Sequence, residues 1–431
     1  MVSLSATQEP TGKLTQQPWM TGSETLAVIK ALTAGGAEVR FVGGCVRDAM
    51  AKRPVNDVDI GTPDPPETVI GLLEKAGIKA IPTGIDHGTV TAMIGENKFE
   101  ITTLRRDVET DGRHAKVAFT DDWVADSERR DFTINALSAT PGGDVYDPHD
   151  GISDLAHGRI RFVGLAQERI EEDALRLLRF FRFFGLFGRP PPNADATVAC
   201  RAMAGKLTEL SGERVRDELL KILLVPDPGE LAVLMRGLGI FDPILPEAED
   251  VGRLRMIAWL ETRAIKIDSV SPDGLRRLAA LLDTDAEGAQ AVAGRLRLSN
   301  QQTLRLVTLA QPPVDLSPEL DEKAFRRALH RLGPDIVRDL ALLAWSEDLA
   351  VTPRLPSERT QGWIELLEAC DEWQGAVFSL QGQDALDLGI PEGPAVGGLM
   401  ARVEDWWEEG DYQAGREACL KKLKALIEED G

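Results

Sequence analysis

The sequence is poor in cysteine, in long apolar runs and in net positive charge, and each shortage narrows what the chain can be. Its four cysteines are far apart in 431 residues, with no CxxC pair and no histidine at ligand spacing beside them. This pattern fits reduced, mostly buried thiols and disfavours a disulfide framework or a zinc site. No apolar run approaches the roughly 18 residues of a membrane helix, and no basic stretch followed by an apolar segment marks a secretory signal. We therefore expect a cytoplasmic protein that does not contact a membrane.

The charge balance is strongly acidic. The formal net charge is −21, which by itself argues against a nucleic-acid partner. The charges are unevenly distributed, however, because acidic residues gather at 247–250 and 404–411 whereas arginines gather at 169–189 and 201–221. The sequence therefore allows a small local footprint on RNA, with weak, salt-sensitive non-specific binding.

Length and patterning predict several structural units. A chain of 431 residues exceeds what one core usually organises. Short β-rich runs alternate with helical stretches in the N-terminal third, whereas the remainder has helical periodicity. The expected fold class is α+β: a disordered tail (1–22), a small α/β head (23–148), a helical neck (149–195), a helical body (196–300) and a helical tail (301–431).

Local patterns fill in the head. We expect helices over 23–34 and 67–76, strands over 79–81, 89–94 and 99–104, and a mobile loop over 105–118. On the strand 99–104, Glu100 is either a third active-site carboxylate or an ordinary exposed strand residue.

Residues 39–52 predict a strand, a sharp turn and a helix. The run 39–42 reads as a short buried strand, and Gly43 and Gly44 break it and let the backbone approach a ligand. The helix predicted over 45–52 begins with free N–H groups, which can bind an anion. Arg47 lies in its first turn, where its charged guanidinium can donate hydrogen bonds to a phosphate. We expect Gly44 and Arg47 to hold the phosphates of a nucleotide.

Two aspartates follow this turn at i, i+2 spacing. Side chains alternate faces along a strand, so the carboxylates of Asp57 and Asp59 point the same way. A divalent cation relieves the crowding of their negative charge, and Mg²⁺ usually completes its shell with substrate phosphates. We predict Asp57 and Asp59 to be catalytic residues and ligands of Mg²⁺, in a layout suited to a nucleoside triphosphate.

The second informative element is a predicted amphipathic helix over residues 169–187. Its apolar side is explained by packing, but its arginines share one strip with acidic residues. Cytosine and adenine present an amine donor beside a ring-nitrogen acceptor, whereas guanine and uracil present a carbonyl beside an N–H. Because a carboxylate only accepts and a guanidinium only donates, an Asp–Arg pair at i, i+3 can accept C and A and reject G and U.

Four stretches together resemble the class II tRNA nucleotidyltransferases, or CCA-adding enzymes, and the bacterial poly(A) polymerases. They are the Gly-Gly turn followed by DVD at 57–59, RRDFTINAL at 129–137, EDALR at 172–176 and SGERVRDELLK at 211–221. The resemblance covers about residues 39–225 and implies a polymerase β-like nucleotidyltransferase head. It further implies two Mg²⁺ ions at Asp57 and Asp59.

The same resemblance implies residue roles in nucleotide binding. Arg130 should contact the incoming nucleotide, and Asp173 and Arg176 should read the base. Glu172 should orient Arg176, and two more arginines should contact the nucleotide from farther along the helix, namely Arg179 and Arg182. The segment 211–221 is expected to brace the neck, the alternative being that Arg214 and Arg216 touch RNA.

The implied activity is template-independent addition or repair of the 3′-terminal CCA of tRNA from CTP and ATP, with release of pyrophosphate. The helical body and tail would hold the acceptor arm by shape and backbone contacts. A poly(A) polymerase and a partial enzyme adding only CC or only A share the same motifs. A catalytically inactive RNA-binding protein is the alternative of another class. Intact Asp57 and Asp59 argue against it, because an inactive copy has no physical reason to keep a like-charge pair.

Overall fold

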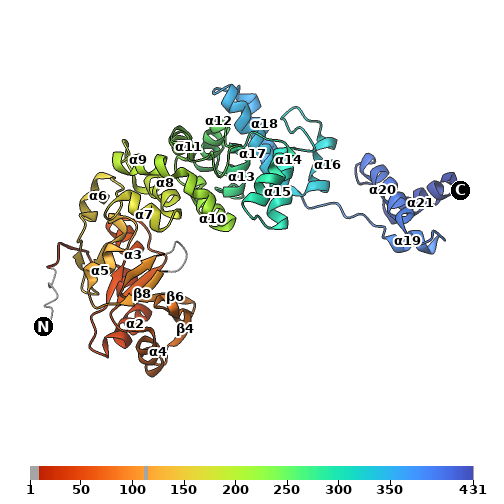
Figure 1. The fold of residues 1–431 in the computed structure, drawn as a ribbon. Coiled ribbons are helices and arrows are strands. Elements are labelled where there is room, and N and C mark those ends of the chain that lie inside the picture. The colour runs from red at the N-terminus through yellow and green to blue at the C-terminus, as the bar shows by residue number, and fades with distance from the viewer. Residues whose placement is uncertain (1–8, 111–114, 431) are drawn as a thin grey trace. The chain divides into compact units, whose positions relative to one another are not determined.

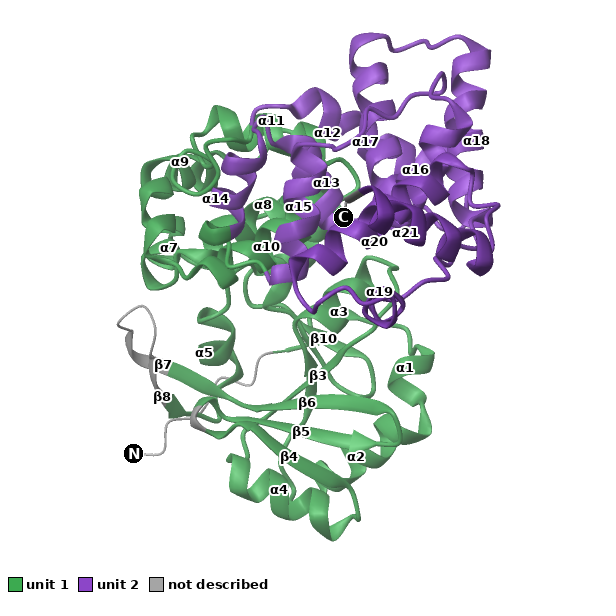
Figure 2. Cartoon of the chain, turned by 90° about the vertical axis from the view of Figure 1, so that its right-hand side faces the viewer, with its two compact units in different colours: residues 1–248, 294–298 green, residues 249–293, 299–431 purple. Residues whose placement is uncertain are grey.

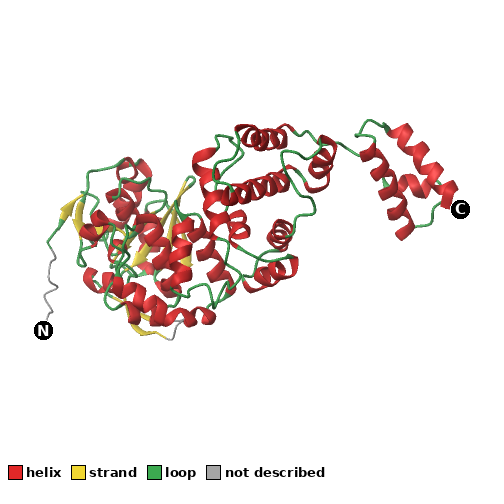
Figure 3. Cartoon of the chain, turned by 90° about the horizontal axis from the view of Figure 1, so that it is seen from above, coloured by secondary structure: helices red, strands yellow, loops and turns green. Residues whose placement is uncertain are grey.

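The computed structural model describes residues 9–110 and 115–430 and divides the chain into two compact units. The first comprises residues 1–248 with 294–298, and the second comprises residues 249–293 with 299–431 (Figure 2). All strands among the described residues belong to the first unit, and the described part of the second is built of helices and loops (Figure 3). The division falls at residue 248, rather than at the boundary of 300 predicted between body and tail. Residues 294–298 return to the first unit, where Arg216 Nη1 donates to the Arg297 carbonyl at 2.7 Å.

The head, drawn in red to orange in Figure 1, is built on an eight-stranded sheet in the order β1-β10-β9-β2-β3-β6-β5-β4. β3 and β6 run parallel, and the other neighbouring strands are antiparallel. The strands are β1 (Gly12–Lys13), β2 (Arg40–Val42), β3 (Val58–Thr62), β4 (Lys79–Gly84), β5 (Thr89–Ile94), β6 (Asn97–Thr103), β9 (Ser138–Ala139) and β10 (Asp144–Tyr146).

A separate two-stranded ladder replaces the loop predicted over 105–118. β7 (Arg105–Thr110) pairs antiparallel with β8 (Ala115–Phe119). Residues 111–114 of the predicted loop lie outside the described residues. For residues 105–110 and 115–118 the loop prediction is wrong, because backbone hydrogen bonds between the two strands form despite their polar, charged sequence.

The core of the head lies between the sheet and its helices. Phe41, Ile60 and Ile101 are fully buried and share a core cluster with Leu32 and Leu73 of two helices. The predicted helices over 23–34 and 67–76 match the observed ones to within a residue. The helices are α1 (Pro18–Thr21), α2 (Ser23–Thr33), α3 (Gly44–Met50), α4 (Pro66–Lys75) and α5 (Trp123–Glu128), with short 3₁₀ turns η1 (Ile85–His87) and η2 (Thr133–Asn135).

Residues 9–22 are ordered, so the prediction of a disordered tail over 1–22 is wrong for this part, and residues 1–8 lie outside the described residues. Gly12 pairs with Val145 between β1 and β10, which gives this edge of the sheet a backbone partner. Leu14 and Met20 are buried in the head core at 5% and 1% exposure. The strand pairing and the burial of two apolar side chains that show no period therefore hold this polar stretch to the head.

Helices fill the rest of the first unit. Phe132 of the RRDFTINAL segment packs against Phe162 and Phe183 at ring-centroid distances of 4.8 and 5.3 Å, which joins the head to α8. The elements are α6 (Gly151–His157), α7 (Ala166–Glu172), α8 (Leu175–Phe187), α9 (Ala194–Met203), the 3₁₀ segment η3 (Ala204–Glu209), α10 (Gly212–Leu223) and α11 (Pro228–Gly237).

The second unit is helical and has a separate C-terminal core. Leu399, Val403 and Trp407 pack with Cys419 and Leu423 in a cluster of their own. None of the described helices of the chain is long and apolar enough to cross a membrane. The helical elements are α12 (Val251–Trp259), the π-helical turn η4 (Leu260–Ala264), α13 (Gly274–Leu281), α14 (Ala286–Arg295, whose last two residues belong to the first unit), α15 (Asn300–Ala310), α16 (Glu322–Leu332), α17 (Pro334–Val351), α18 (Ser357–Glu372), α19 (Gly382–Asp387), α20 (Pro394–Glu409) and α21 (Arg416–Asp430).

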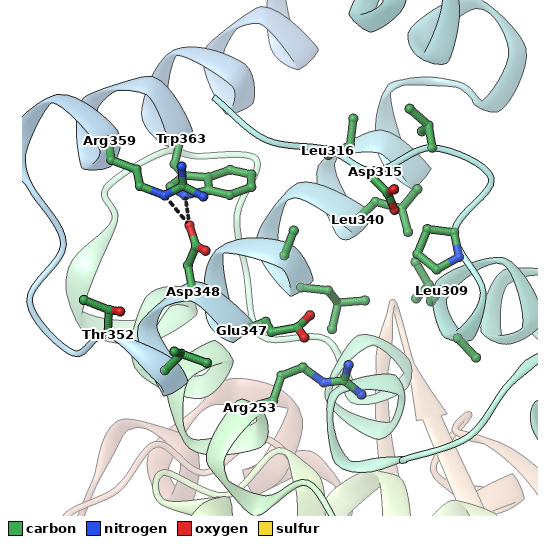
Figure 4. Close-up of a pocket in the computed structure, with 16 residues that line it drawn as sticks. Arg253, Leu309, Asp315, Leu316, Leu340, Glu347, Asp348, Thr352, Arg359 and Trp363 are labelled. Carbon is green, nitrogen blue, oxygen red and sulfur yellow. Dashed lines mark hydrogen bonds and ion pairs between the residues drawn. The ribbon is translucent and has the colours of Figure 1, made fainter. Parts of the chain in front are cut away.

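A hollow of about 560 Å³ opens in this second unit, between α17, α18 and the segment that follows α15 (Figure 4). On its wall, Asp348 accepts hydrogen bonds from Arg359 Nε at 2.7 Å and Trp363 Nε1 at 3.1 Å. None of the residues predicted to bind nucleotide or metal lines it. The functional site therefore has to be sought in the first unit.

The burial of Met20 gives a test of the ordered N-terminal segment. Met20→Ala should lower the free energy of unfolding of the head by about 2–5 kcal/mol, because a fully buried side chain leaves a cavity. Leu26→Ala, which removes a side chain that is 49% exposed on the neighbouring helix, should cost under about 1 kcal/mol. Urea unfolding followed by circular dichroism measures both. Equal small losses would show that the segment does not contribute to the core.

Candidate functional site

The backbone geometry of the Gly-Gly turn explains why its first residue is glycine. Gly43 has φ of +69°, and a Cβ there would lie 2.8 Å from Nη1 of Arg130. The absence of a side chain thus lets the guanidinium of Arg130 lie against the turn, which no local pattern at residue 43 predicted. α3 starts at Gly44, one residue before the predicted helix start, so Gly44 occupies its first turn.

The carboxylates meet across the single parallel pair of the sheet. Asp59 on β3 is in register with Glu100 on β6, so the two side chains leave the sheet on the same face. Burial, then the charge of Glu100, raise the pKa of Asp59 to about 6; Asp57 adds to the rise, and Arg130 opposes it. The register therefore brings a third carboxylate beside the predicted pair, Asp57 and Asp59.

This donor set fits a divalent cation. Crowded carboxylates suit a hard cation with oxygen ligands, and the repulsion that raises the pKa of Asp59 is what such an ion relieves. Among the described residues, no three His, Cys, Asp or Glu side chains stand close enough to hold a metal by themselves. An ion at Asp57 and Asp59 would therefore need further oxygen ligands, which Mg²⁺ commonly takes from water and substrate phosphates.

Both head arginines predicted to bind nucleotide are held by acidic neighbours. Arg47 pairs with Asp48 at 2.9 Å and donates to Asn135 Oδ1 at 2.5 Å. Its guanidinium also lies 4.7 Å from the ring centroid of Phe187, and burial lowers its pKa. Arg130 pairs with Asp126 at 3.2 Å.

A hydrogen-bond chain connects Arg47 to helix α8. Asn135 accepts from Arg47 and donates its Nδ2 to Asp131 Oδ1 at 2.9 Å. Asp131 Oδ2 in turn accepts from Arg179 Nε at 2.6 Å. Burial raises the pKa of Asp131, but Arg179 and the hydrogen bonds from Asn135 and the Phe132 amide outweigh it, so the pKa is lowered. This chain fixes the orientation of Arg179 relative to the Gly-Gly turn.

The predicted single helix over 169–187 is in fact two helices, and the prediction of one continuous element is wrong. α7 ends at Glu172, and Asp173 has an extended backbone (φ −153°, ψ 106°) before α8 begins at Leu175. The break is stabilised because Asp173 Oδ1 accepts the Leu175 amide at 3.1 Å, as Asp commonly does at a helix start. Asp173 and Arg176 therefore do not lie at i, i+3 on one helix face.

The partners within this helix pair also differ from the predicted pattern. Asp173 is paired with Arg214 of α10 at 2.8 Å rather than with Arg176. Arg176 pairs with Glu172 at 2.5 Å, as expected for a residue that Glu172 orients, and donates to the Arg129 carbonyl at 3.1 Å.

The remaining predicted arginine, Arg182, is held across the helix interface. It pairs at 2.5 Å with Glu218 of α10, whose side chain is 4% exposed. The structure thus brings Asp57, Asp59, Gly43 and Arg130 together in the head and gives each arginine of the predicted set an acidic partner.

Sequence reasoning did not predict the pairing of four residues that support the site, which are Asp126, Asn135, Arg214 and Glu218. Asp126 lies only four residues before its partner Arg130. The other three lie inside motifs that were recognised, but their partners are 36 to 88 residues away, as in Arg182–Glu218 and Arg47–Asn135. Periodicity carries no signal for pairs at such separations.

Known proteins resemble this chain in both its head and its helical part. A family model described as the poly A polymerase head domain matches residues 39–161, and one described as the probable RNA and SrmB-binding site of polymerase A matches residues 194–251. The CCA tRNA nucleotidyltransferase 1, mitochondrial, of Danio rerio is 34% identical over 390 residues, covering 90% of this chain and 87% of that protein. The CCA-adding enzyme of Streptococcus pneumoniae (strain CGSP14) is 29% identical over 415 residues, covering 96% and 99%.

A solved structure extends the match to the fold. The crystal structure of the Bacillus stearothermophilus CCA-adding enzyme in complex with CTP has a TM-score of 0.75 and 26% identity, covering 97% of this chain and 100% of that one. The fold and the head domain thus define a nucleotidyltransferase. More specifically, the chain belongs to the CCA tRNA nucleotidyltransferase family, so the fold class and the resemblance predicted from sequence are confirmed.

The Asp131 chain gives a stability test with a defined pH dependence. Asp131→Asn should lower the free energy of unfolding by about 1–3 kcal/mol at pH 7, because Arg179 loses a buried charged partner. Since the pKa of Asp131 is lowered on folding, its ionised form stabilises the native state above the unfolded pKa of about 3.9. The difference between wild type and variant should therefore shrink as the pH falls below about 4.

The control is Asp217→Asn, whose carboxylate is 57% exposed and pairs with Arg216 at the surface. That change should cost under about 1 kcal/mol at any pH. Urea unfolding at pH 7 and pH 3.5 measures both variants. A pH-independent loss for Asp131→Asn would contradict the assigned ion pair.

Proposed function

We propose that this chain adds or repairs the 3′-terminal CCA of tRNA, using CTP and ATP and releasing pyrophosphate. The observation that carries the proposal is the register of Asp59 with Glu100, where the charge of Asp57 also acts on Asp59, beside a Gly-Gly turn against which Arg130 lies. Membership of the family over nine-tenths of the chain gives the same activity. The partners are tRNA, CTP and ATP.

In this proposal, the head binds the triphosphate. The turn at Gly43 and Gly44 admits phosphates close to the backbone, while Arg47 and Arg130 donate to their oxygens. Asp57 and Asp59 would hold Mg²⁺, which when bound favours deprotonation of the tRNA 3′-hydroxyl and neutralises charge on the triphosphate. We propose Glu100 as the third carboxylate of this site, where it adds an acceptor beside Asp59.

Base choice would come from Asp173 and Arg176. A carboxylate at Asp173 accepts from the exocyclic amine of cytosine or adenine, and Arg176 donates to the ring nitrogen. Glu172 and the Arg129 carbonyl fix the Arg176 guanidinium, which supports its role as an oriented donor. Arg179 and Arg182, held by Asp131 and Glu218, would contact the nucleotide from farther along α8.

We also propose that the helical body and tail hold the acceptor arm of the tRNA.

The chain is further proposed to work in the cytoplasm. This assignment is supported by the four cysteines, all of them free and buried. Fractionation of the cells that make the protein, with the chain detected by antibody, tests it. Recovery in an organelle or with membranes would contradict it.

Product analysis tests the activity. Purified protein is incubated with Mg²⁺, with tRNA lacking its CCA end, and with each nucleoside triphosphate separately and together. We expect three added nucleotides, CCA, and loss of the reaction in EDTA that Mg²⁺ restores. A long homopolymer from ATP would indicate a poly(A) polymerase, and extension by only CC or only A would indicate a partial enzyme. RNA binding without any extension would indicate the inactive RNA-binding alternative.

Asp57→Ala should abolish nucleotide transfer while the protein stays folded, because a proposed metal ligand is lost from an exposed position and no buried packing is removed. The matched control is Asp121→Ala, which removes another exposed aspartate of the head and should leave transfer unchanged. Transfer is followed on gels and folding by circular dichroism. Substantial transfer by folded Asp57→Ala in Mg²⁺ would rule out the metal assignment.

Asp173→Ala should change which nucleotide is used. The lost hydrogen bond to a charged group is worth about 1.5–3 kcal/mol, or roughly ten- to a hundredfold in kcat/KM for CTP and ATP. The relative use of UTP and GTP should rise, because Asp173 repels their carbonyls. Arg176→Ala should relax the choice similarly.

Values of kcat/KM for all four nucleotides on one tRNA primer decide this. Uniformly lower rates with an unchanged ratio of C and A to U and G would mean that these residues position the nucleotide without reading it.

A further inference from the structure

The carboxylate proposed to read the base receives only one backbone hydrogen bond from the helix that follows it. Asp173 lies in the extended break between α7 and α8, so helical backbone geometry does not fix its side chain. Its Oδ1 accepts the Leu175 amide at 3.1 Å. The other contacts to this carboxylate come from Arg214, whose Nη2 reaches Oδ1 at 3.0 Å and Oδ2 at 2.8 Å.

Arg214 itself stands on a well-fixed helix. α10 packs against α8, with Val215 and Leu219 buried. Four residues after Arg214 on the same helix, the buried Glu218 pairs with Arg182 of α8. At the start of α10, a Cβ on Gly212 would lie 2.2 Å from the Arg295 carbonyl, so the helix end also approaches backbone closely. The guanidinium thus extends from an anchored support toward a carboxylate that has little support of its own.

From this geometry we infer that Arg214 is a positioning residue for nucleotide choice: it orients Asp173 so that the carboxylate can accept the exocyclic amine of cytosine or adenine. This rests on the proposed reading role of Asp173. A carboxylate has about four lone-pair sites, and the contacts with Arg214 and the Leu175 amide leave acceptor capacity for a substrate amine. The side chains of Arg214 and Asp173 are 40% and 30% exposed, so a nucleotide can reach them.

Positioning of Asp173 by Arg214 differs in its measurable effect from both roles expected of the segment 211–221. If the segment only braced the neck, loss of Arg214 would lower the free energy of unfolding, and a pair this exposed contributes little to that free energy. If Arg214 contacted RNA, its loss would weaken tRNA binding. If Arg214 positions Asp173, its loss changes the ratio in which the four nucleotides are used, which neither of the other roles changes.

The test compares Arg214→Gln with Arg216→Gln, its neighbour two residues along α10. Arg216 pairs with Asp217 and donates to the Arg297 carbonyl, with no contact to Asp173. We expect Arg214→Gln to lower the kcat/KM ratio of CTP and ATP over UTP and GTP by about tenfold. The ratio should stay within about twofold of wild type for Arg216→Gln, and Arg214→Lys, which keeps the charge but not the planar fork, should fall between.

A double variant shows whether Arg214 acts through Asp173. In the Asp173→Ala background, adding Arg214→Gln should change the ratio by less than about twofold, because the group it orients is gone. Independent, multiplying effects would overturn the inference, as would an unchanged ratio with weaker tRNA binding in the single variant. If Arg214→Gln fails to fold, the lysine variant decides by the same comparison. A wild type that shows no preference for CTP and ATP would contradict the proposed function itself, whereas a selective wild type with a selective Arg214→Gln contradicts only this inference.

Discussion

Each arginine predicted at this site is held by a carboxylate, and the geometry of the site depends on that pairing. Arg47 is held by Asp48, Arg130 by Asp126, Arg176 by Glu172, Arg179 by Asp131 and Arg182 by Glu218. A free guanidinium samples many rotamers, and ordering it at the moment of binding weakens the complex. Paired in advance, these guanidinium groups keep fixed directions, as the proposed contacts to the nucleotide require.

The fold supplies the second constraint, which is the register of the one parallel strand pair. It sets Glu100 opposite Asp59 and gathers like charges that a cation would neutralise. Aromatic packing of Phe132 with Phe162 and Phe183, together with the chain from Arg47 through Asn135 and Asp131 to Arg179, connects this cluster to α8. The carboxylates and the proposed base-reading residues therefore belong to one connected structure within the first unit.

Much of this could be predicted from the sequence because the informative signals were local. The Gly-Gly turn, the Asp57–Asp59 spacing and the helices over 23–34 and 67–76 involve neighbours in the chain, and short-range geometry decides them. Three features could not be predicted in that way. The order of residues 9–22 depends on pairing of Gly12 with Val145, the break at Asp173 interrupts a strong helical period, and Arg214 comes from another helix. The first and the third are contacts between distant residues, and the second is a local hydrogen bond from the Leu175 amide to Asp173 that outweighs helix propensity.

In the proposed reaction, side chains of this protein choose the nucleotide without a nucleic-acid template. Calorimetric titration of the wild-type chain with each of the four nucleoside triphosphates, in Mg²⁺ and without tRNA, tests it most directly. We expect CTP and ATP to bind with a Kd at least about tenfold below those of UTP and GTP, since one hydrogen bond to a charged group separates the two classes. Four equal dissociation constants, with discrimination appearing only after tRNA is added, would contradict it.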